Sequence, residues 1–157
     1  MDPKTMYRKI DRILGELTPL RVDCGVTCGG ACCKGDGDTG MRLFPHEESS
    51  LSVRELENGV RLVVCDGVCD RRERPLACRL FPFFPVIDEK GRIFVEPDAR
   101  ALRLCPLLTH SEEIVFDKRF FKAVKKVGKL LAKDADCRRF LEETTEEMDT
   151  YAAFLGY

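Results

Sequence analysis

The sequence lacks a long apolar run, a hydrophobic leader and a strong net charge. No stretch approaches the roughly 18 apolar residues that a membrane-spanning helix needs, so no membrane partner is expected. The formal net charge is −1, so no overall electric field draws the chain toward nucleic acid. Residues 1–9 contain no apolar core typical of a signal peptide, which predicts a cytoplasmic protein in a reducing environment.

The sequence also lacks internal repeats and low-complexity segments, and its 157 residues have the usual length of one domain. Hydrophobic residues make up 44% of the chain, which is enough to bury a core without covalent staples. We therefore expect a single small α+β domain over residues 1–157, mostly helical, with irregular cysteine-rich loops and a short β-hairpin. Residues 20–108 would contain the cysteine motifs, and residues 111–157 would form a helical C-terminal part.

The first two thirds of the chain contain three periodic segments. Residues 2–17 predict an amphipathic helix that Asp2 caps and that Pro19 ends. Residues 60–64 predict a strand that leads into Cys65. Residues 83–87 and 92–96 predict the two strands of a hairpin. Strands so few and so short can build only a small sheet.

Two further helices are predicted at the C-terminal end, over residues 117–133 and 135–155. Outside their apolar stripes, the first is rich in lysine and the second in glutamate. We interpret these charged faces as solvated, because exposed ion pairs contribute little; an antiparallel pairing of the two helices is the alternative. Both helices are expected to pack against the N-terminal helix. Cys137 lies on the apolar stripe of the second, which predicts a core residue.

Cysteine is the residue type in excess. The chain has nine, at Cys24, Cys28, Cys32, Cys33, Cys65, Cys69, Cys78, Cys105 and Cys137. The odd count, the missing leader and the adjacent pair Cys32–Cys33 all argue against a disulfide framework. In a cytoplasmic chain, clustered cysteines more often bind metal or carry out redox chemistry.

The first four cysteines lie close together, in the segment Cys24-Gly-Val-Thr-Cys28-Gly-Gly-Ala-Cys32-Cys33. Four thiolates match the ligand number of tetrahedral zinc or of an iron–sulfur cluster. The glycines allow the chain to turn back on itself and to bring thiolates and backbone N–H groups together. A buried apolar role is a poor alternative, because the segment has no periodic apolar face.

Four more cysteines follow, at Cys65, Cys69, Cys78 and Cys105. The eight together would make either two four-sulfur sites or one site with a supporting shell. Thiolate-rich sites carry excess negative charge, which nearby cations and backbone N–H groups offset. The candidate cations are Lys34, Arg71, Arg72, Arg74 and Arg79. A plain solvated turn accounts for the arginines equally well.

Other side chains near the cysteines are weaker candidates. His46 and His110 are interpreted as surface or capping residues rather than ligands. Four carboxylates are candidates for one further ligand or a general base: Glu47, Glu48, Asp66 and Asp70. Five phenylalanines flank the cysteine segments: Phe44, Phe81, Phe83, Phe84 and Phe94. We interpret them as ordinary core, with shielding of a metal from water as the alternative.

The order of these motifs resembles a known family. The group Cys24…Cys28…Cys32-Cys33 is followed by Gly40-Met41-Arg42-Leu43-Phe44-Pro45, then by Cys65…Cys69, then by Arg74-Pro75-Leu76-Ala77-Cys78-Arg79-Leu80-Phe81-Pro82. Over residues 20–108 this order is similar to the cysteine-cluster family of zinc- or iron-chelating domain proteins (CxxCxxCC type). That family is distantly similar to the cysteine-rich part of the flagellin lysine N-methylases, with which an iron–sulfur cluster is associated. The resemblance implies that the metal ligands are Cys24, Cys28, Cys32, Cys33, Cys65, Cys69, Cys78 and Cys105.

The sequence therefore predicts a thiolate-rich metal-binding protein. Zinc is the first choice of metal, because it fills tetrahedral sulfur sites whatever the redox state; iron or a 4Fe-4S cluster is the alternative. Three other roles stay open: an iron–sulfur-dependent protein-modifying or redox enzyme, a structural zinc module for protein–protein interaction, and metal storage or delivery. The expected partners are a metal ion and, in the enzyme and module roles, a protein. The sequence indicates no oligomeric state.

Overall fold

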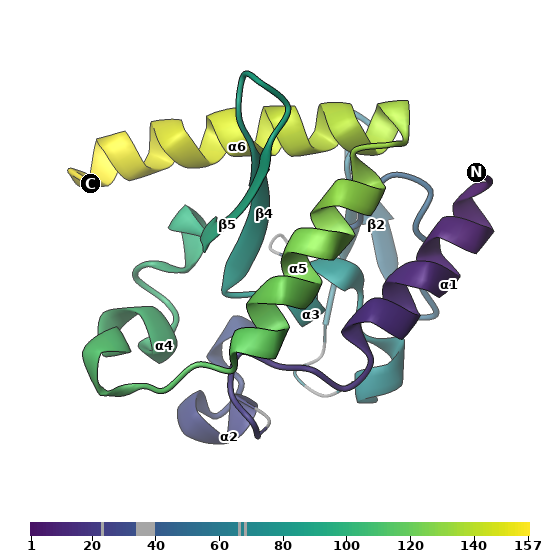
Figure 1. Ribbon diagram of the computed structural model, residues 1–157. Coiled ribbons are helices and arrows are strands. Elements are labelled where there is room, and N and C mark those ends of the chain that lie inside the picture. Colours follow the sequence, from purple (N-terminus) through teal and green to yellow (C-terminus); the bar gives the residue numbers. More distant parts are fainter. Residues whose placement is uncertain (23, 34–39, 66, 68) are drawn as a thin grey trace.

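The computed structural model describes all residues from 1 to 157 except 23, 34–39, 66 and 68 (Figure 1). It confirms the predicted fold class, α+β and mostly helical. The described helices are α1 (Pro3–Leu14), α2 (Gly25–Cys28), α3 (Leu76–Leu80), α4 (Pro106–Thr109), α5 (Lys118–Leu131) and α6 (Ala135–Leu155). The strands are β1 (Met41–Arg42), β2 (Val53–Glu55), β3 (Arg61–Val63), β4 (Phe83–Ile87) and β5 (Ile93–Pro97). Four 3-10 turns complete them: η1 (Ala31–Cys33), η2 (Arg71–Glu73), η3 (Ala99–Ala101) and η4 (Ser111–Glu113).

The predicted hairpin, β4 and β5, contacts α5 and α6, with Phe83 opposite Pro97 and Ile87 opposite Ile93. All five residues of β4 are buried, because helices cover both of its faces. Phe83 packs its ring against Phe120 of α5. The next residue, Phe84, points to the other face and stacks on Phe44.

Helix α1 begins as predicted, with Asp2 accepting the backbone N–H of Thr5. It buries Met6, Ile10 and Leu14 along one face. The predicted end at Pro19 is wrong, because α1 ends at Leu14. Gly15 adopts a φ of +48°, which a glycine tolerates, and its N–H bonds the carbonyl of Asp11 and closes the last turn.

Helices α5 and α6 lie where they were predicted, and Asp117 and Asp134 cap them. Helix α5 packs along α1, and α6 packs mainly against β4 and η3. Helix α6 also meets α1 where the Tyr7 and Cys137 side chains share a hydrogen bond, so both predicted helices contact α1. Figure 1 shows α6 crossing one end of the molecule at a steep angle to α5, so the two do not run as an antiparallel pair. Among the described residues, no helix has the length and apolar character to cross a membrane.

A second, smaller sheet has the order β1-β3-β2, and both pairings are antiparallel. The sequence predicts only β3 of these three strands. All residues of β2 are exposed, so no alternation of apolar and polar residues marks it. Gly40 leads into β1 where it passes β3 closely: a Cβ atom there would lie 2.3 Å from the carbonyl oxygen of Val63.

Candidate metal centre

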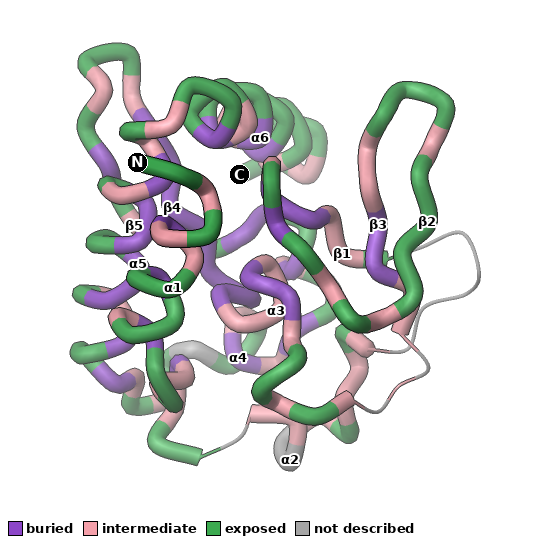
Figure 2. The backbone as a smooth tube through the Cα atoms, turned by 90° about the vertical axis from the view of Figure 1, so that its right-hand side faces the viewer, coloured by how far each residue is buried: buried purple, intermediate pink, exposed green. Residues whose placement is uncertain are grey.

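Eight of the nine cysteines gather from five separate segments. They lie around α2 and in η1, in the segment that follows β3, in α3, and directly before α4. Figures 1 and 2 both place α2 at the end of the molecule opposite α6. The structure describes all nine cysteines, and none of them forms a disulfide. The candidate ligands are thus thiols outside disulfides, and those around α2 lie at this end of the fold.

Four of these thiols line one small cavity: Cys24, Cys28, Cys32 and Cys105. Its volume is about 20 Å³, which is room for one water-sized species. The other lining residues are almost all apolar and include Phe81, Pro82 and Leu107. Cysteine side chains are therefore the chemically active groups in an otherwise apolar wall.

The local chain conformation explains how three of the four reach this cavity. Helix α2 is a single turn, and Cys24 precedes it at the N-cap position, one helical turn before Cys28. The Cys28 Sγ atom lies 3.9 Å from the carbonyl oxygen of Cys24. Gly29 then adopts a φ of +62° and ends the helix. The chain turns back into η1, which carries Cys32.

The remaining four candidate ligands, Cys33, Cys65, Cys69 and Cys78, are electrostatic neighbours. Burial raises the pKa of the Cys33 thiol, its hydrogen bond with Cys32 lowers that pKa, and the proximity of Cys65 and Cys69 raises it. Burial also raises the pKa of Cys78, and the nearby thiols of Cys33, Cys32, Cys69 and Cys65 raise it further. The backbone N–H of Gly67 lies 3.4 Å from the Cys65 Sγ atom and donates to it. A hydrogen bond from a glycine N–H to a cysteine sulfur is expected from the glycine-rich composition of these loops.

Two of the four thiols around the cavity have raised pKa values. Cys32 is exposed as a residue, but the partial desolvation of its thiol raises its pKa to about 12, with further contributions from Cys33, Cys24 and Cys28. Burial is also the main cause that raises the pKa of Cys105. These groups are protonated at neutral pH without a metal. A metal ion that binds them must therefore displace protons.

The candidate arginines lie beside the cysteine-bearing region. Arg74 lowers the pKa of Cys33, opposing the effect of burial. Arg71 donates to the carbonyl of Glu16 at 2.9 Å, and Arg79 bonds Asp11 at 2.6 Å. These two arginines join the cysteine-bearing region to the end of α1. Lys34, the other candidate cation, lies outside the described residues.

Glu47 is the carboxylate with a defined role near the cysteines. It is 7% exposed, and its two oxygens accept the backbone N–H groups of Phe44 at 2.9 Å and Leu76 at 2.6 Å. Burial raises its pKa despite these bonds. Leu76 begins α3, whose N-cap residue Pro75 offers no side-chain acceptor, so Glu47 supplies one. One oxygen therefore caps the helix that carries Cys78, and the other holds the backbone at Phe44.

The other predicted carboxylates and phenylalanines have ordinary roles. Asp70 caps η2, Glu48 is exposed, and Asp66 lies outside the described residues. Phe81 is the one predicted phenylalanine that lines the cysteine cavity. The core interpretation holds for Phe44, Phe83 and Phe84. Phe94 is 39% exposed, with Arg92 and Lys125 beside its ring.

Cys137 is confirmed as a core residue. It is fully buried on α6, and its Sγ atom lies 3.7 Å from the carbonyl oxygen of Pro45. Burial raises the pKa of this thiol to about 12. It belongs to the main core around the hairpin rather than to the cysteine cavity.

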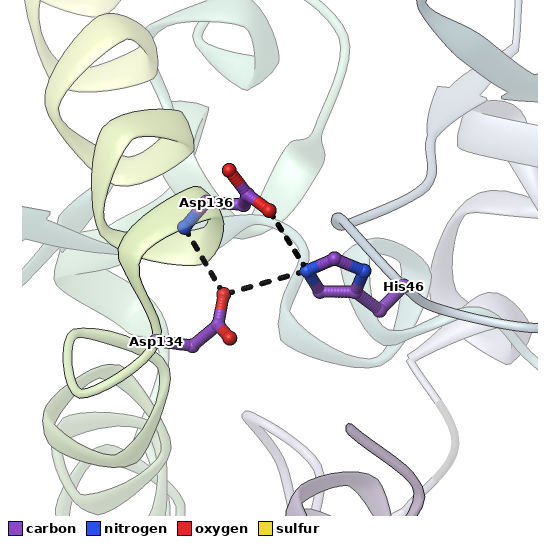
Figure 3. Close-up of side chains that lie close together, drawn as sticks. All are labelled: His46, Asp134 and Asp136. Atoms are coloured by element: carbon purple, nitrogen blue, oxygen red, sulfur yellow. Dashed lines mark hydrogen bonds and ion pairs between the residues drawn. The ribbon is translucent and has the colours of Figure 1, made fainter. Parts of the chain in front are cut away.

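One close group of potential metal ligands lies elsewhere and is not predicted from the sequence. His46 Nε2 lies 3.6 Å from Asp134 Oδ1 and 3.1 Å from Asp136 Oδ2 (Figure 3). Asp134 already accepts the N–H groups of Asp136 and Cys137 as the cap of α6. This arrangement attaches the turn at His46 to the start of α6. The other histidine, His110, ends α4 and is exposed.

The distances between the cysteine sulfur atoms determine how well these thiols fit a metal ion. Tetrahedral zinc, with Zn–S bonds of about 2.3 Å, holds its sulfurs about 3.8 Å apart. Within the described part of the chain, no three cysteine sulfurs all lie within 4.8 Å of one another. Zinc therefore requires the thiols to move closer together. A 4Fe-4S cluster, whose cysteines bind different irons, requires the small cavity to open. Thiolates are the ligand type that both groups accept.

Comparison with protein-family models, with curated proteins and with solved structures finds no match to this chain.

Proposed function

We propose that this protein binds metal through cysteine thiolates, with zinc as the first candidate and iron, as an iron–sulfur cluster, as the second. The observation that carries the proposal is that four cysteine thiols from separate parts of the chain line one small cavity, with further cysteines as their electrostatic neighbours and no disulfide among them. A core cysteine is normally a single small apolar residue on a periodic face, as Cys137 is here. A core role does not explain eight thiols in irregular segments, whereas metal ligation does.

The surroundings of the thiols support the same function. Phe81, Pro82 and Leu107 give the cavity an apolar wall, and a low local dielectric strengthens the attraction between a cation and its thiolates. Arg74 and the N–H of Gly67 reduce the excess negative charge of a thiolate site. The nine cysteines without a disulfide favour a reducing compartment, so we propose a cytoplasmic location.

The decisive experiment is metal analysis of the full chain purified without oxygen from cells supplied with both zinc and iron. We expect at least one zinc or iron per chain, with broad visible absorption where iron is present. Cys32→Ser should lower the metal content, whereas the matched variant Cys137→Ser should retain it. A wild-type protein that holds neither metal and takes up neither on reconstitution would refute the proposal.

A second observation favours one version of this function, a structural zinc module. No residue of η1 is buried, and α2 is a single turn, so little packing holds these segments in place. Metal binding would then supply the free energy that orders them. Removing the metal with a strong chelator should change the circular dichroism spectrum and speed proteolysis between residues 24 and 33. An unchanged protein after complete metal removal argues against the structural role. The enzyme and storage roles stay predictions of the sequence.

A further inference from the structure

Helices α1 and α5 lie side by side, and a basic groove runs between them (Figures 1 and 2). The groove has a volume of about 400 Å³. Five cations and two apolar side chains line it: Lys9, Arg12, Lys126, Lys129, Lys133, Ile13 and Leu130. We propose that this groove is a docking surface for the acidic outer face of α6 in a second copy of the chain.

The five cations of the groove have no opposing charge. All five are exposed, and in the described part of the chain none of their side chains forms an ion pair or a hydrogen bond. No carboxylate lines the groove. Helix α5 has no acidic residue from Lys118 to Leu131, so nothing on that helix neutralises them. Cations held this close repel one another, and a negatively charged occupant relieves that repulsion.

The floor of the groove is apolar. Ile13 and Leu130 are half-buried and pack against the main core, whereas the cations around them are exposed. Nucleic acid gains little from this floor, because the groove has no aromatic side chain on which a base could stack. A membrane surface requires apolar side chains that project outward. An amphipathic helix with acidic and apolar side chains fits both the cations and the floor.

The outer face of α6 has these properties. Exposed residues recur on it every three or four positions, at Glu143, Glu146, Thr150 and Phe154. This face lies opposite the stripe that α6 buries against β4. Phe154 is 84% exposed. Among the described residues, neither Glu143 nor Glu146 has an ion-pair partner. The face therefore offers unpaired negative charge followed by an exposed aromatic ring.

This face cannot reach the groove of its own chain. Helix α6 begins at Ala135, directly after Lys133 at the groove, and its 21 residues span about 30 Å. Packing on β4 holds α6 in place. Figure 1 shows its C-terminal end on the opposite side of the molecule from α1. The groove and the outer face of α6 are thus separate surfaces, and each copy of the chain offers one of each.

The first test measures the oligomeric state of the full-length wild-type chain by analytical ultracentrifugation. A reducing agent is present, so that disulfides between copies do not contribute. Exposed ion pairs are weak and are screened by salt. We expect dimers or larger assemblies at about 0.05 M salt and monomers at about 1 M salt. A chain that is monomeric at low salt, or whose association does not respond to salt, would overturn the proposal.

Charge-reversal variants then test the two surfaces. A groove variant combines Lys126→Glu, Lys129→Glu and Lys133→Glu, and an α6 variant combines Glu143→Lys and Glu146→Lys. Each variant alone should be monomeric at low salt, because its groove and its α6 face have charges of the same sign. A mixture of the two should associate again, since each groove then meets an α6 face of opposite charge. This recovery also shows that both variants are folded.

The matched control reverses three charges on α5 outside the groove, with Lys118→Glu, Lys122→Glu and Lys125→Glu. It changes the net charge as much as the groove variant does and should self-associate like the wild type. Equal loss of association in both would overturn the proposal, as would a mixture of the groove and α6 variants that stays monomeric. A monomeric wild type that binds anionic vesicles or RNA, with binding lost in the groove variant, would assign the groove to that ligand instead.

Discussion

The carboxylate of Glu47 accepts the backbone N–H of Leu76 at 2.6 Å, although 29 positions separate the two residues in the chain. Its other oxygen accepts the N–H of Phe44. One buried side chain thus joins the segment before His46 to the first residue of α3, which carries Cys78. Since α3 has no cap of its own, this contact fixes where the Cys78 thiol lies.

Glu47→Gln should therefore destabilise the protein. Glutamine presents one oxygen and one NH₂ group, so one of the two buried backbone N–H groups loses its acceptor. An unsatisfied buried donor costs about 1–3 kcal/mol, and we expect a decrease of that size in the free energy of unfolding. Urea denaturation of the metal-free chain measures it.

Glu48→Gln is the matched control, because Glu48 is exposed and a surface change of this kind stays within about 0.5 kcal/mol. Metal stoichiometry separates the two roles that the sequence allows for Glu47. If Glu47→Gln loses metal while its unfolding free energy is unchanged, Glu47 is a ligand rather than a structural acceptor.

Zinc binding should release protons at pH 7. Burial raises the pKa of Cys32 to about 12 and also raises the pKa values of Cys33, Cys78 and Cys105, so these groups are thiols before the metal arrives. Ligation requires thiolates, so roughly one proton leaves for each thiol ligand, and the zinc affinity should rise with pH. A pH indicator in weak buffer measures the release. Zinc uptake at pH 7 without proton release would show that the ligands are not these thiols.

Acid stability should depend on Asp117. Hydrogen bonds from the Arg119 side chain and backbone N–H lower its pKa from about 3.8 to about 2. A lowered carboxyl pKa means that the folded state favours the charged form. Its stabilising contribution is therefore complete above the unfolded pKa and disappears as the pH falls through about 2.

Asp117→Asn isolates this charge effect, because asparagine is an equally good helix cap. At pH 6 the melting temperature of Asp117→Asn should be lower than that of the wild type. The difference should shrink between pH 4 and pH 2. Thermal melts at fixed ionic strength measure it, and a difference that stays constant over this range would mean that the ion pair with Arg119 contributes nothing.

Several helices and strands could be predicted from the sequence, because a single local sequence signal determines each of them. Asp2 and Pro3 predict the start of α1, and the apolar runs on both sides of residues 88–91 predict the hairpin. The end of α1 was not found, because Gly15 closes the helix before the more obvious Pro19. Strands β1 and β2 were missed because neither shows alternating burial; pairing with β3 creates them.

The candidate set of cysteine ligands comes from the density of cysteines in the sequence and stays a prediction. The positions of its members relative to one another could not be predicted from the sequence. Sequence spacing places Cys32 and Cys33 together, whereas the direction of each side chain in η1 depends on how the loop closes. Cys105 reaches the cavity only through tertiary packing. The contact of His46 with Asp134 and Asp136 has the same origin, because no local pattern links residue 46 to α6.

Gly40 and Gly128 each lie at a close contact with another part of the chain. Gly40 is near the cysteine-bearing segments and Gly128 is not. A Cβ atom at Gly40 would lie 2.3 Å from the Val63 carbonyl oxygen, and one at Gly128 would lie 2.7 Å from side-chain atoms of Ile93 and Pro85. Gly40→Ala and Gly128→Ala should therefore each cost about 1–3 kcal/mol of unfolding free energy. In α5, part of this cost is offset by the better helix propensity of alanine, about 1 kcal/mol.

Only Gly40→Ala should affect metal retention. It displaces β3, and Cys65 follows the end of β3 by two residues, so one thiolate moves away from its partners. Gly128→Ala moves α5 relative to the hairpin and leaves the cysteine segments where they are. The rate of metal transfer to a chromophoric chelator distinguishes the two variants, with faster transfer expected for Gly40→Ala alone. If two equally destabilised variants transfer metal at equal rates, metal release follows global unfolding. The position of Cys65 then does not limit the release.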